Sequence, residues 1–297
     1  MCLEKNIIFD KNILSSVHIN FLFGSGVNGN AFPQLANFEE TKEEIEELGG
    51  SLENGLEAGI DEIQNEEDRE KIKSVFIQEF RKAHEKINNQ SFWENNLSIG
   101  NLRELLRETH SLVQKTENRR SSMKQINIFT LNYDQIVEKL LSELGYFYSE
   151  ISSSNTSTRS GLLDVIGYDY KVKRYIPSFM VSKLHGDMDK PIIPGKNKYQ
   201  EVLNEDYFEI VFNMKEQLCR QNSILIVIGY SGGDKHINKI LLDCINAGLT
   251  VYWYRYKKNE TIPFKESSQV IICDQKDEND LEDSTRVFIK DMNEIWE

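Results

Sequence analysis

The chain carries the stretch FTLNYD at residues 129–134, where an apolar strand predicted over 126–131 gives way to an amphipathic helix. Open α/β sheets bind ligands at this kind of junction, outside the carboxyl end of a strand. Asn132 and Asp134 place an amide and a carboxylate there, and polar groups beside apolar residues need partners. Taken alone, the pair can cap the following helix, because short polar side chains accept the first helical N–H groups. The stretch therefore predicts a strand–turn–helix unit and leaves capping and chemistry open.

Glycine-rich turns follow two other predicted strands. The strand at 17–23 runs into GSGVNGN at 24–30, and the aliphatic run at 224–228 runs into GYSGGD at 229–234. Glycine lets backbone N–H groups approach a pyrophosphate closely, although a plain turn needs the same residues. An unbroken aliphatic run is typical of a parallel strand buried on both faces. Phe32 adds an aromatic ring just after the first turn, and we include it among the expected cofactor contacts.

A histidine follows a fourth segment, in which residues 180–184 lead into His185 and Gly186. Histidine at the end of a strand is suited to acid–base chemistry, and the neighbouring glycine leaves room for a ligand. A single histidine can equally be a structural residue bonded to a backbone carbonyl. Further along, Ser231 and Asp234 have the spacing of a capping box at the start of the next helix.

The order of strand and helix patterns predicts an α/β protein with a doubly wound, Rossmann-like, mostly parallel sheet. Residues 36–120 have apolar positions at three- and four-residue steps and form a large helical insertion in that framework. Their acidic run at 39–47 indicates a solvated helix face or a partner-binding surface. The Ser- and Thr-rich segment 149–161 is expected to be a surface loop, and 168–179 extended or hairpin structure. We expect residues 1–297 to form a single domain.

Length and charge exclude several protein classes. At 297 residues, with 39% hydrophobic and 28% charged residues, the composition is that of a globular protein with a sizeable core. The net charge of −13 opposes phosphate backbones, so direct nucleic-acid binding is not expected. No run approaches the roughly 20 apolar residues of a membrane span, and Glu4 and Lys5 lie where a signal peptide has its apolar run. We expect a cytoplasmic protein without membrane association.

The cysteines give no sign of a metal site. They are scattered along the chain at Cys2, Cys219, Cys244 and Cys273. A zinc ribbon needs paired thiolates at short spacing, which this pattern does not supply. We therefore expect reduced thiols and neither a zinc ribbon nor another metal site.

Four motifs stand in order along the chain: GSG at 24–26, TLNYD at 130–134, LHG at 184–186 and GYSGGD at 229–234. Together they resemble the sirtuin (silent information regulator) fold, and more closely its bacterial defence branch, the sirtuin-like NAD hydrolases of anti-phage systems. The resemblance covers these short motifs only. It has no counterpart for the acidic helical region or the C-terminal helix.

The resemblance implies that NAD binds as a substrate at the carboxyl edge of the sheet. The residues it carries over are Asn132, His185 and Asp134 for catalysis, Gly24, Ser25 and Gly26 for the dinucleotide phosphates, and Gly229, Ser231 and Asp234 for the adenosine side. Asp234 is equally consistent with a cap role. Ser25 departs from the usual Gly-Ala-Gly form of the first motif, and only Cys219 lies between His185 and Gly229, where deacylases of this fold carry a zinc ribbon with two CxxC pairs.

The function implied by the resemblance is hydrolysis of the nicotinamide–ribose bond by a regulated effector of bacterial anti-phage defence that depletes NAD. Such an enzyme is expected to be a homo-oligomer. The resemblance also points to a partner protein, such as the HerA-type hexameric ATPase of some sirtuin-like defence pairs. Two alternatives stay open: an NAD-dependent protein deacylase, and a non-catalytic module that senses NAD or ADP-ribose.

Overall fold

A computed structural model describes residues 16–53, 55–116, 119–120, 123–152, 156–159, 165–170, 174–187, 191, 205–256, 262–274 and 283–294. Its main sheet has eight strands in the order β10-β9-β8-β1-β2-β7-β3-β4. Every neighbouring pair is parallel except β3–β4, which is antiparallel. The strands are β1 (His18–Phe23), β2 (Ile126–Thr130), β3 (Tyr148–Ile151), β4 (Thr156–Arg159), β7 (Phe179–Lys183), β8 (Ser223–Ile228), β9 (Thr250–Tyr254) and β10 (Val270–Cys273).

The central strands are buried on both faces, as their apolar sequences require. All residues of β2 and β8 are buried, and β1 is buried from Ile19 onward. Side chains alternate between the two faces of each strand. Phe21 and Phe23 therefore enter one apolar cluster, while Leu22 enters the other.

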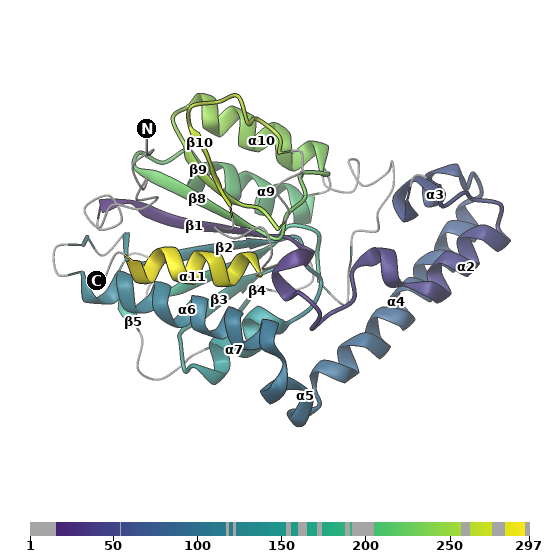
Figure 1. The fold of residues 1–297 in the computed structure, drawn as a ribbon, viewed down its shortest axis with the longest axis horizontal. Coiled ribbons are helices and arrows are strands. Elements are labelled where there is room, and N and C mark those ends of the chain that lie inside the picture. Colours follow the sequence, from purple (N-terminus) through teal and green to yellow (C-terminus); the bar gives the residue numbers. More distant parts are fainter. Residues whose placement is uncertain are drawn as a thin grey trace, which may run out of the picture.

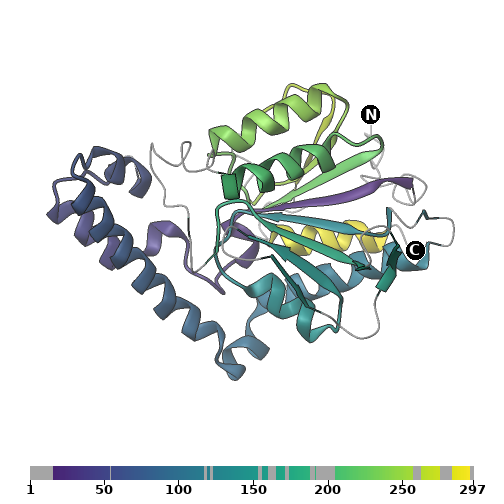
Figure 2. The same cartoon turned by 180° about the vertical axis from the view of Figure 1, so that it is seen from behind.

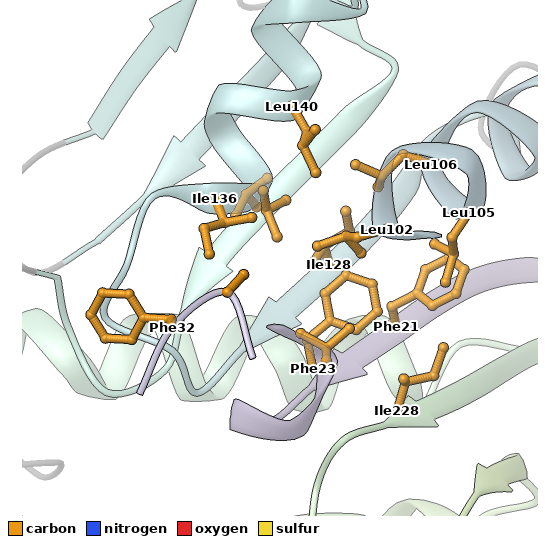
Figure 3. Packing of buried hydrophobic residues seen from close by; sticks show 14 of the residues in the cluster. Phe21, Phe23, Phe32, Leu102, Leu105, Leu106, Ile128, Ile136, Leu140 and Ile228 are labelled. Carbon is orange, nitrogen blue, oxygen red and sulfur yellow. The ribbon is translucent and has the colours of Figure 1, made fainter. Parts of the chain in front are cut away.

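Helices cover both faces of the sheet (Figures 1 and 2). On one face lie α6 (Leu97–Lys115), α7 (Ile136–Glu143) and α11 (Ser284–Glu294), whose apolar side chains join the cluster that contains Phe21 and Phe23 of β1. Figure 3 shows this packing for α6 and α7. On the other lie α9 (Glu205–Leu218) and α10 (Lys235–Asn246). The predicted doubly wound, mostly parallel sheet is confirmed. No helix in the described part of the chain has the length and hydropathy of a membrane span.

Further helices project from one end of the sheet (Figure 1). They are α2 (Glu39–Glu47), α3 (Leu56–Glu62), α4 (Glu66–Ile87) and α5 (Gln90–Asn95). We call α2–α4 the helical arm. Its base is held by aromatic rings, because Phe76 and Phe80 of α4 each make an edge contact with Tyr133 at 5.9 Å between ring centroids. The arm is therefore packed directly on the turn that carries Asn132 and Asp134.

Two local expectations have different outcomes. The segment 168–179 contains the predicted hairpin, formed by β5 (Val165–Asp169) and β6 (Arg174–Pro177). The surface loop predicted over 149–161 is wrong where the structure describes it, because β3 and β4 pair there at the edge of the sheet. Residues 153–155 and 160–161 lie outside the described residues. The polar sequence of this segment gives no strand pattern, and its strands form only because β3 pairs with β7 and β4 pairs with β3. The assignment of 1–297 to one domain with an insertion at 36–120 stays a prediction.

Candidate active site

The four motifs follow four neighbouring parallel strands. Phe23 of β1 pairs with Thr130 of β2 and with Ile228 of β8, and Thr130 pairs with Lys183 of β7. These residues form one row at the carboxyl edge of the sheet, and the motif residues follow it directly. Chain order also reverses at β1, because β2 and β7 lie on one side of it and β8–β10 on the other. Doubly wound sheets bind ligands in the crevice at such a switch point.

The two glycine loops pack against each other at this edge. The Gly24 N–H donates to the Ile228 carbonyl at 3.1 Å, and the Gly26 N–H donates to the Gly229 carbonyl at 3.0 Å. Gly229 has a φ of +70°, and a Cβ there would lie 2.1 Å from the Val27 nitrogen. A Cβ on Gly24 would lie 2.4 Å from the Gly229 oxygen. Glycine is therefore required for contact between the loops, in addition to the close approach of a ligand expected from the sequence.

Asn132 and Asp134 are both tied to the first glycine loop, whose short 3-10 helix η1 spans Ser25–Asn28. The Asn132 side-chain N–H donates to the Gly24 carbonyl at 3.2 Å. The Asn28 side-chain N–H donates to Asp134 Oδ2 at 2.6 Å. Asp134 Oδ1 accepts the N–H of Ile136 at 3.0 Å, at the start of α7. Asp134 therefore binds both the first N–H of α7 and the loop, whereas the Asn132 amide donates to the loop alone.

A buried lysine lies behind these residues. Lys183, with a fully buried side chain, pairs with Glu138 at 2.9 Å and donates to the backbone carbonyl of Asp134. Burial lowers the pKa of Lys183, but the charges of Glu138 and Asp134 outweigh this and raise it overall. Burial raises the pKa of Asp134, and the charge of Lys183 and the accepted hydrogen bonds offset only part of the rise. The positive charge of Lys183 and the negative charges of Glu138 and Asp134 therefore stabilise one another in the interior.

A cavity of about 230 Å³ lies beside this buried group, between α4, α7 and β3. Its lining includes His84 and Glu138. Burial lowers the pKa of His84, and the positive charge of Lys183 lowers it further. None of the predicted site residues lines this cavity.

His185 faces the second glycine loop and the start of α10. It is 4% exposed, and its Nε2 lies 3.3 Å from the Nε2 of His236 and 3.6 Å from Oδ1 of Asp234. Only one of two facing Nε2 atoms can donate in a hydrogen bond, so the pair requires unlike tautomers or a shared partner. The structure thus brings His185 and Asp234 together, as the motifs implied. The sequence analysis missed His236, whose only signal is its position two residues after Asp234.

The capping box predicted for Ser231 and Asp234 is wrong. Helix α10 begins at Lys235 with Asp234 as its N-cap, and no side chain makes a cap hydrogen bond there. The turn is held by Tyr230, whose hydroxyl accepts the N–H of Asp234 at 3.1 Å. The hydroxyl of the buried Tyr230 reaches this N–H because the loop turns back toward Tyr230 before α10 begins.

The remaining predicted contacts differ in their surroundings. Ser25 and Ser231 are exposed on the two glycine loops. Phe32 is 7% exposed, with its ring centroid 4.8 Å from that of Phe80 in the helical arm. This core contact accounts for Phe32 without a ligand. Its role in cofactor binding stays a prediction.

The sequence identifies the family. The SIR2-like domain matches residues 126–279, slightly more than half of the chain. The chain belongs to the SIR2-like domain family. In this SIR2-like chain the matched stretch includes Asn132, His185 and Asp234, whereas the first glycine loop lies before it.

Solved structures of related architecture are similar to this SIR2-like chain at low identity. One is described as "Crystal structure of a Sir2 homolog-NAD complex", with 12% identity, TM-score 0.47, and coverage of 100% of this chain and 94% of that chain. Another, "Structural Basis for the Mechanism and Regulation of Sir2 Enzymes", has 11% identity, TM-score 0.43, and coverage of 96% and 95%. A third, "Sir2-p53 peptide-NAD+", has 13% identity, TM-score 0.41, and coverage of 99% and 98%. No curated protein matches the chain. These similarities are too weak to transfer activity, so membership of the family rests on the sequence match.

Proposed function

We propose that this protein hydrolyses NAD+ at the bond between nicotinamide and ribose C1′, releasing nicotinamide and ADP-ribose. The observation that supports this most is that Asn132 and His185 follow the aligned ends of two neighbouring parallel strands. Thr130 and Lys183 are paired across β2 and β7, and each functional side chain stands two residues beyond its strand end. The Leu184 N–H donates to the Thr130 carbonyl at 2.8 Å and extends that alignment past the last strand residue.

The chemistry requires positioning more than acid catalysis, since nicotinamide is already a cationic leaving group. Water adds to C1′ while the C1′–N bond breaks, and nicotinamide leaves with the bonding electrons. His185 accepts the proton from the attacking water or from a ribose hydroxyl, a contribution of roughly 10²–10⁴-fold in rate. Asn132, with its amide plane set by the bond to Gly24, holds the water or the ribose.

Asp134 is better described as a positioning residue than as a group that contacts the reacting atoms. Its two oxygens accept from Asn28 and from the N–H of Ile136, and it is 4% exposed. It connects the first glycine loop to the Asn132 turn. The glycine loops at 24–26 and 229–233 would then hold the dinucleotide across the switch point.

Hydrolysis is favoured over protein deacylation by the sequence between His185 and Gly229. Cys219 is the one cysteine in that interval, so the two CxxC pairs of a zinc ribbon cannot be formed there. A deacylase of this fold carries that module, so its loss lowers the expectation of acyl-lysine substrates. Cleavage of NAD does not depend on it.

We also propose that the enzyme is a regulated effector of anti-phage defence, because an uncontrolled NAD hydrolase would deplete its own cell. The acidic helical arm is a candidate surface for self-assembly or for a partner such as a HerA-type ATPase. The contacts of Phe76 and Phe80 with Tyr133 give the arm a direct mechanical connection to the Asn132 turn. A change in the arm could therefore alter the positions of catalytic groups.

The test is chromatographic analysis of products from purified protein and NAD+, with and without the candidate ATPase and an acetylated peptide. We expect nicotinamide and ADP-ribose without peptide, and faster release with the partner. His185→Ala and Asn132→Ala should each lower nicotinamide release by at least about 100-fold. His110→Ala and Asn246→Ala, which make the same substitutions away from the strand ends, are the matched controls.

Other results would assign other functions. Acetyl-ADP-ribose formed only with peptide would identify a deacylase. Binding of NAD without turnover, with or without the partner, would identify a sensing module. Normal nicotinamide release by a folded Asn132→Ala protein would refute the proposed site.

A further inference from the structure

His185, Asp234 and His236 converge from two separate parts of the fold. His185 follows β7, whereas Asp234 and His236 lie at the start of α10. Each side chain offers one ligand atom, and the three atoms all lie within 4.8 Å of one another. Two imidazoles and a carboxylate are a ligand set that Zn²⁺ accepts, with the fourth position left for water.

The two distances from His185 fit one ion shared with Asp234 and His236. Zn²⁺ binds imidazole nitrogen and carboxylate oxygen at about 2.0–2.2 Å, so tetrahedral ligand atoms lie about 3.4 Å apart. The two Nε2 atoms of His185 and His236 lie 3.3 Å apart, and Asp234 Oδ1 lies 3.6 Å from His185 Nε2. We propose that these residues form a Zn²⁺ site at the edge of the catalytic crevice. This departs from the expectation drawn from the sequence, which found no metal site.

The simpler alternative is a hydrogen bond between the two histidines. That bond explains the 3.3 Å separation, and the 3.6 Å between His185 Nε2 and Asp234 Oδ1 is the distance of an ion pair when His185 is protonated. A single metal ion accounts for both distances and for the convergence of three ligand atoms within 4.8 Å of one another. Imidazole ligands also favour Zn²⁺ over Mg²⁺ or Ca²⁺, which prefer oxygen.

The surroundings hold the ligands in place before any ion binds. The Tyr230 hydroxyl accepts the Asp234 N–H, and the Asn238 side chain donates to the Gly232 carbonyl at 2.7 Å. The start of α10 disfavours a cation through the helix dipole. The negative charge of Asp234, the N-cap residue of α10, opposes this effect.

An ion at this position would block the chemistry of His185. Coordination uses the Nε2 lone pair, which a general base needs to accept a proton. Zn²⁺ would therefore inhibit nicotinamide release, a consequence that rests on the proposed function. Binding of the ion does not rest on it.

The test begins with protein stripped of metal by a chelator and then titrated calorimetrically with Zn²⁺. We expect one tight site in the native protein and visible d–d absorption when Co²⁺ replaces Zn²⁺. His236→Gln should weaken binding by at least about 100-fold, because removing a ligand costs no less than removing its supporting shell. His110→Gln, on α6 away from the cluster, should bind as the native protein does.

Thermal unfolding supplies a second measurement that does not depend on activity. Zn²⁺ should raise the melting temperature of the native protein and of His110→Gln, but not of His236→Gln. If His236→Gln fails to fold, Asp234→Asn replaces it, with the same weakening expected. Equal binding by the native protein and a folded ligand variant would overturn the site, as would no binding by the native protein.

Activity separates the two proposals. Each protein is compared with its own metal-free rate, and only those that bind Zn²⁺ should be inhibited. Turnover without Zn²⁺ binding would leave the proposed function standing and remove the site. Zn²⁺ binding that requires His236, in a protein that never cleaves NAD+, would keep the site and remove the function.

Discussion

The two halves of the candidate site are built differently. In the asparagine half, Asn132 and Asp134 use their side chains to hold the first glycine loop and the start of α7. In the histidine half, His185 lies against Asp234 and His236, whose atoms converge without forming a cap for α10. The first half is supported by buried charge, and the second reaches the surface through Asp234, whose side chain is 18% exposed.

The two halves should therefore respond differently to substitution, in stability as well as in activity. A change in the asparagine half removes bonds that hold the loop, so it should affect folding as well as activity. In the histidine half, Asp234 makes no side-chain cap hydrogen bond to α10, so its loss should affect folding less than the loss of Asp134. Loss of activity in a variant of either half is therefore interpreted beside its melting temperature, with the larger change in melting temperature expected in the asparagine half.

The largest expected effect on stability is at Lys183, which supports the asparagine half from behind. Lys183→Met leaves Glu138 and Asp134 buried without their cation, and should cost roughly 3–5 kcal/mol in the free energy of unfolding. Urea denaturation followed by circular dichroism measures this. Lys215→Met, which breaks the exposed pair with Asp243, is the control and should change stability little. Equal effects of the two variants would show that the buried charge does not support this half.

A matched pair of aspartates compares the halves directly. Asp134→Ala leaves the Asn28 amide and the Ile136 N–H without their acceptor, at a cost of about 2–3 kcal/mol. Asp234→Ala removes no cap hydrogen bond and should cost less. Melting temperatures of metal-free proteins give the comparison. A lower melting temperature for Asp234→Ala than for Asp134→Ala would show that the asparagine half does not contribute more to stability than the histidine half.

The smallest expected effect is in the pH dependence of stability. Burial and then the Lys183 charge lower the pKa of His84 below its usual 6.5. The native state therefore binds fewer protons than the unfolded state as pH falls through about 6.5, and stability falls with it until the lowered native pKa is reached. His84→Gln should flatten part of this slope. The rest should persist, because burial also lowers the pKa of His18. An unchanged slope in His84→Gln would show that His84 is not held neutral.

Much of the fold was readable from local patterns. The aliphatic run at 224–228 coincides with β8, and the amphipathic pattern near the end of the chain coincides with α11. The pair β3–β4 could not be predicted, because these polar residues form strands only through tertiary pairing, β3 with β7 and β4 with β3 at the sheet edge. The start of α10 was misjudged because Tyr230, and not Ser231, holds the turn.

The sequence by itself determined that Gly24, Asn132, His185 and Gly229 each follow a strand. That information is local, since strand patterns and the polar residues that end them lie within a few positions of one another. Only the tertiary structure decided that those strands are neighbours in the order β8-β1-β2-β7, with their ends in one row. Strand order depends on how helices far apart in sequence pack on the two faces, which no local pattern records. The same packing placed His236 3.3 Å from His185, across 51 residues of chain.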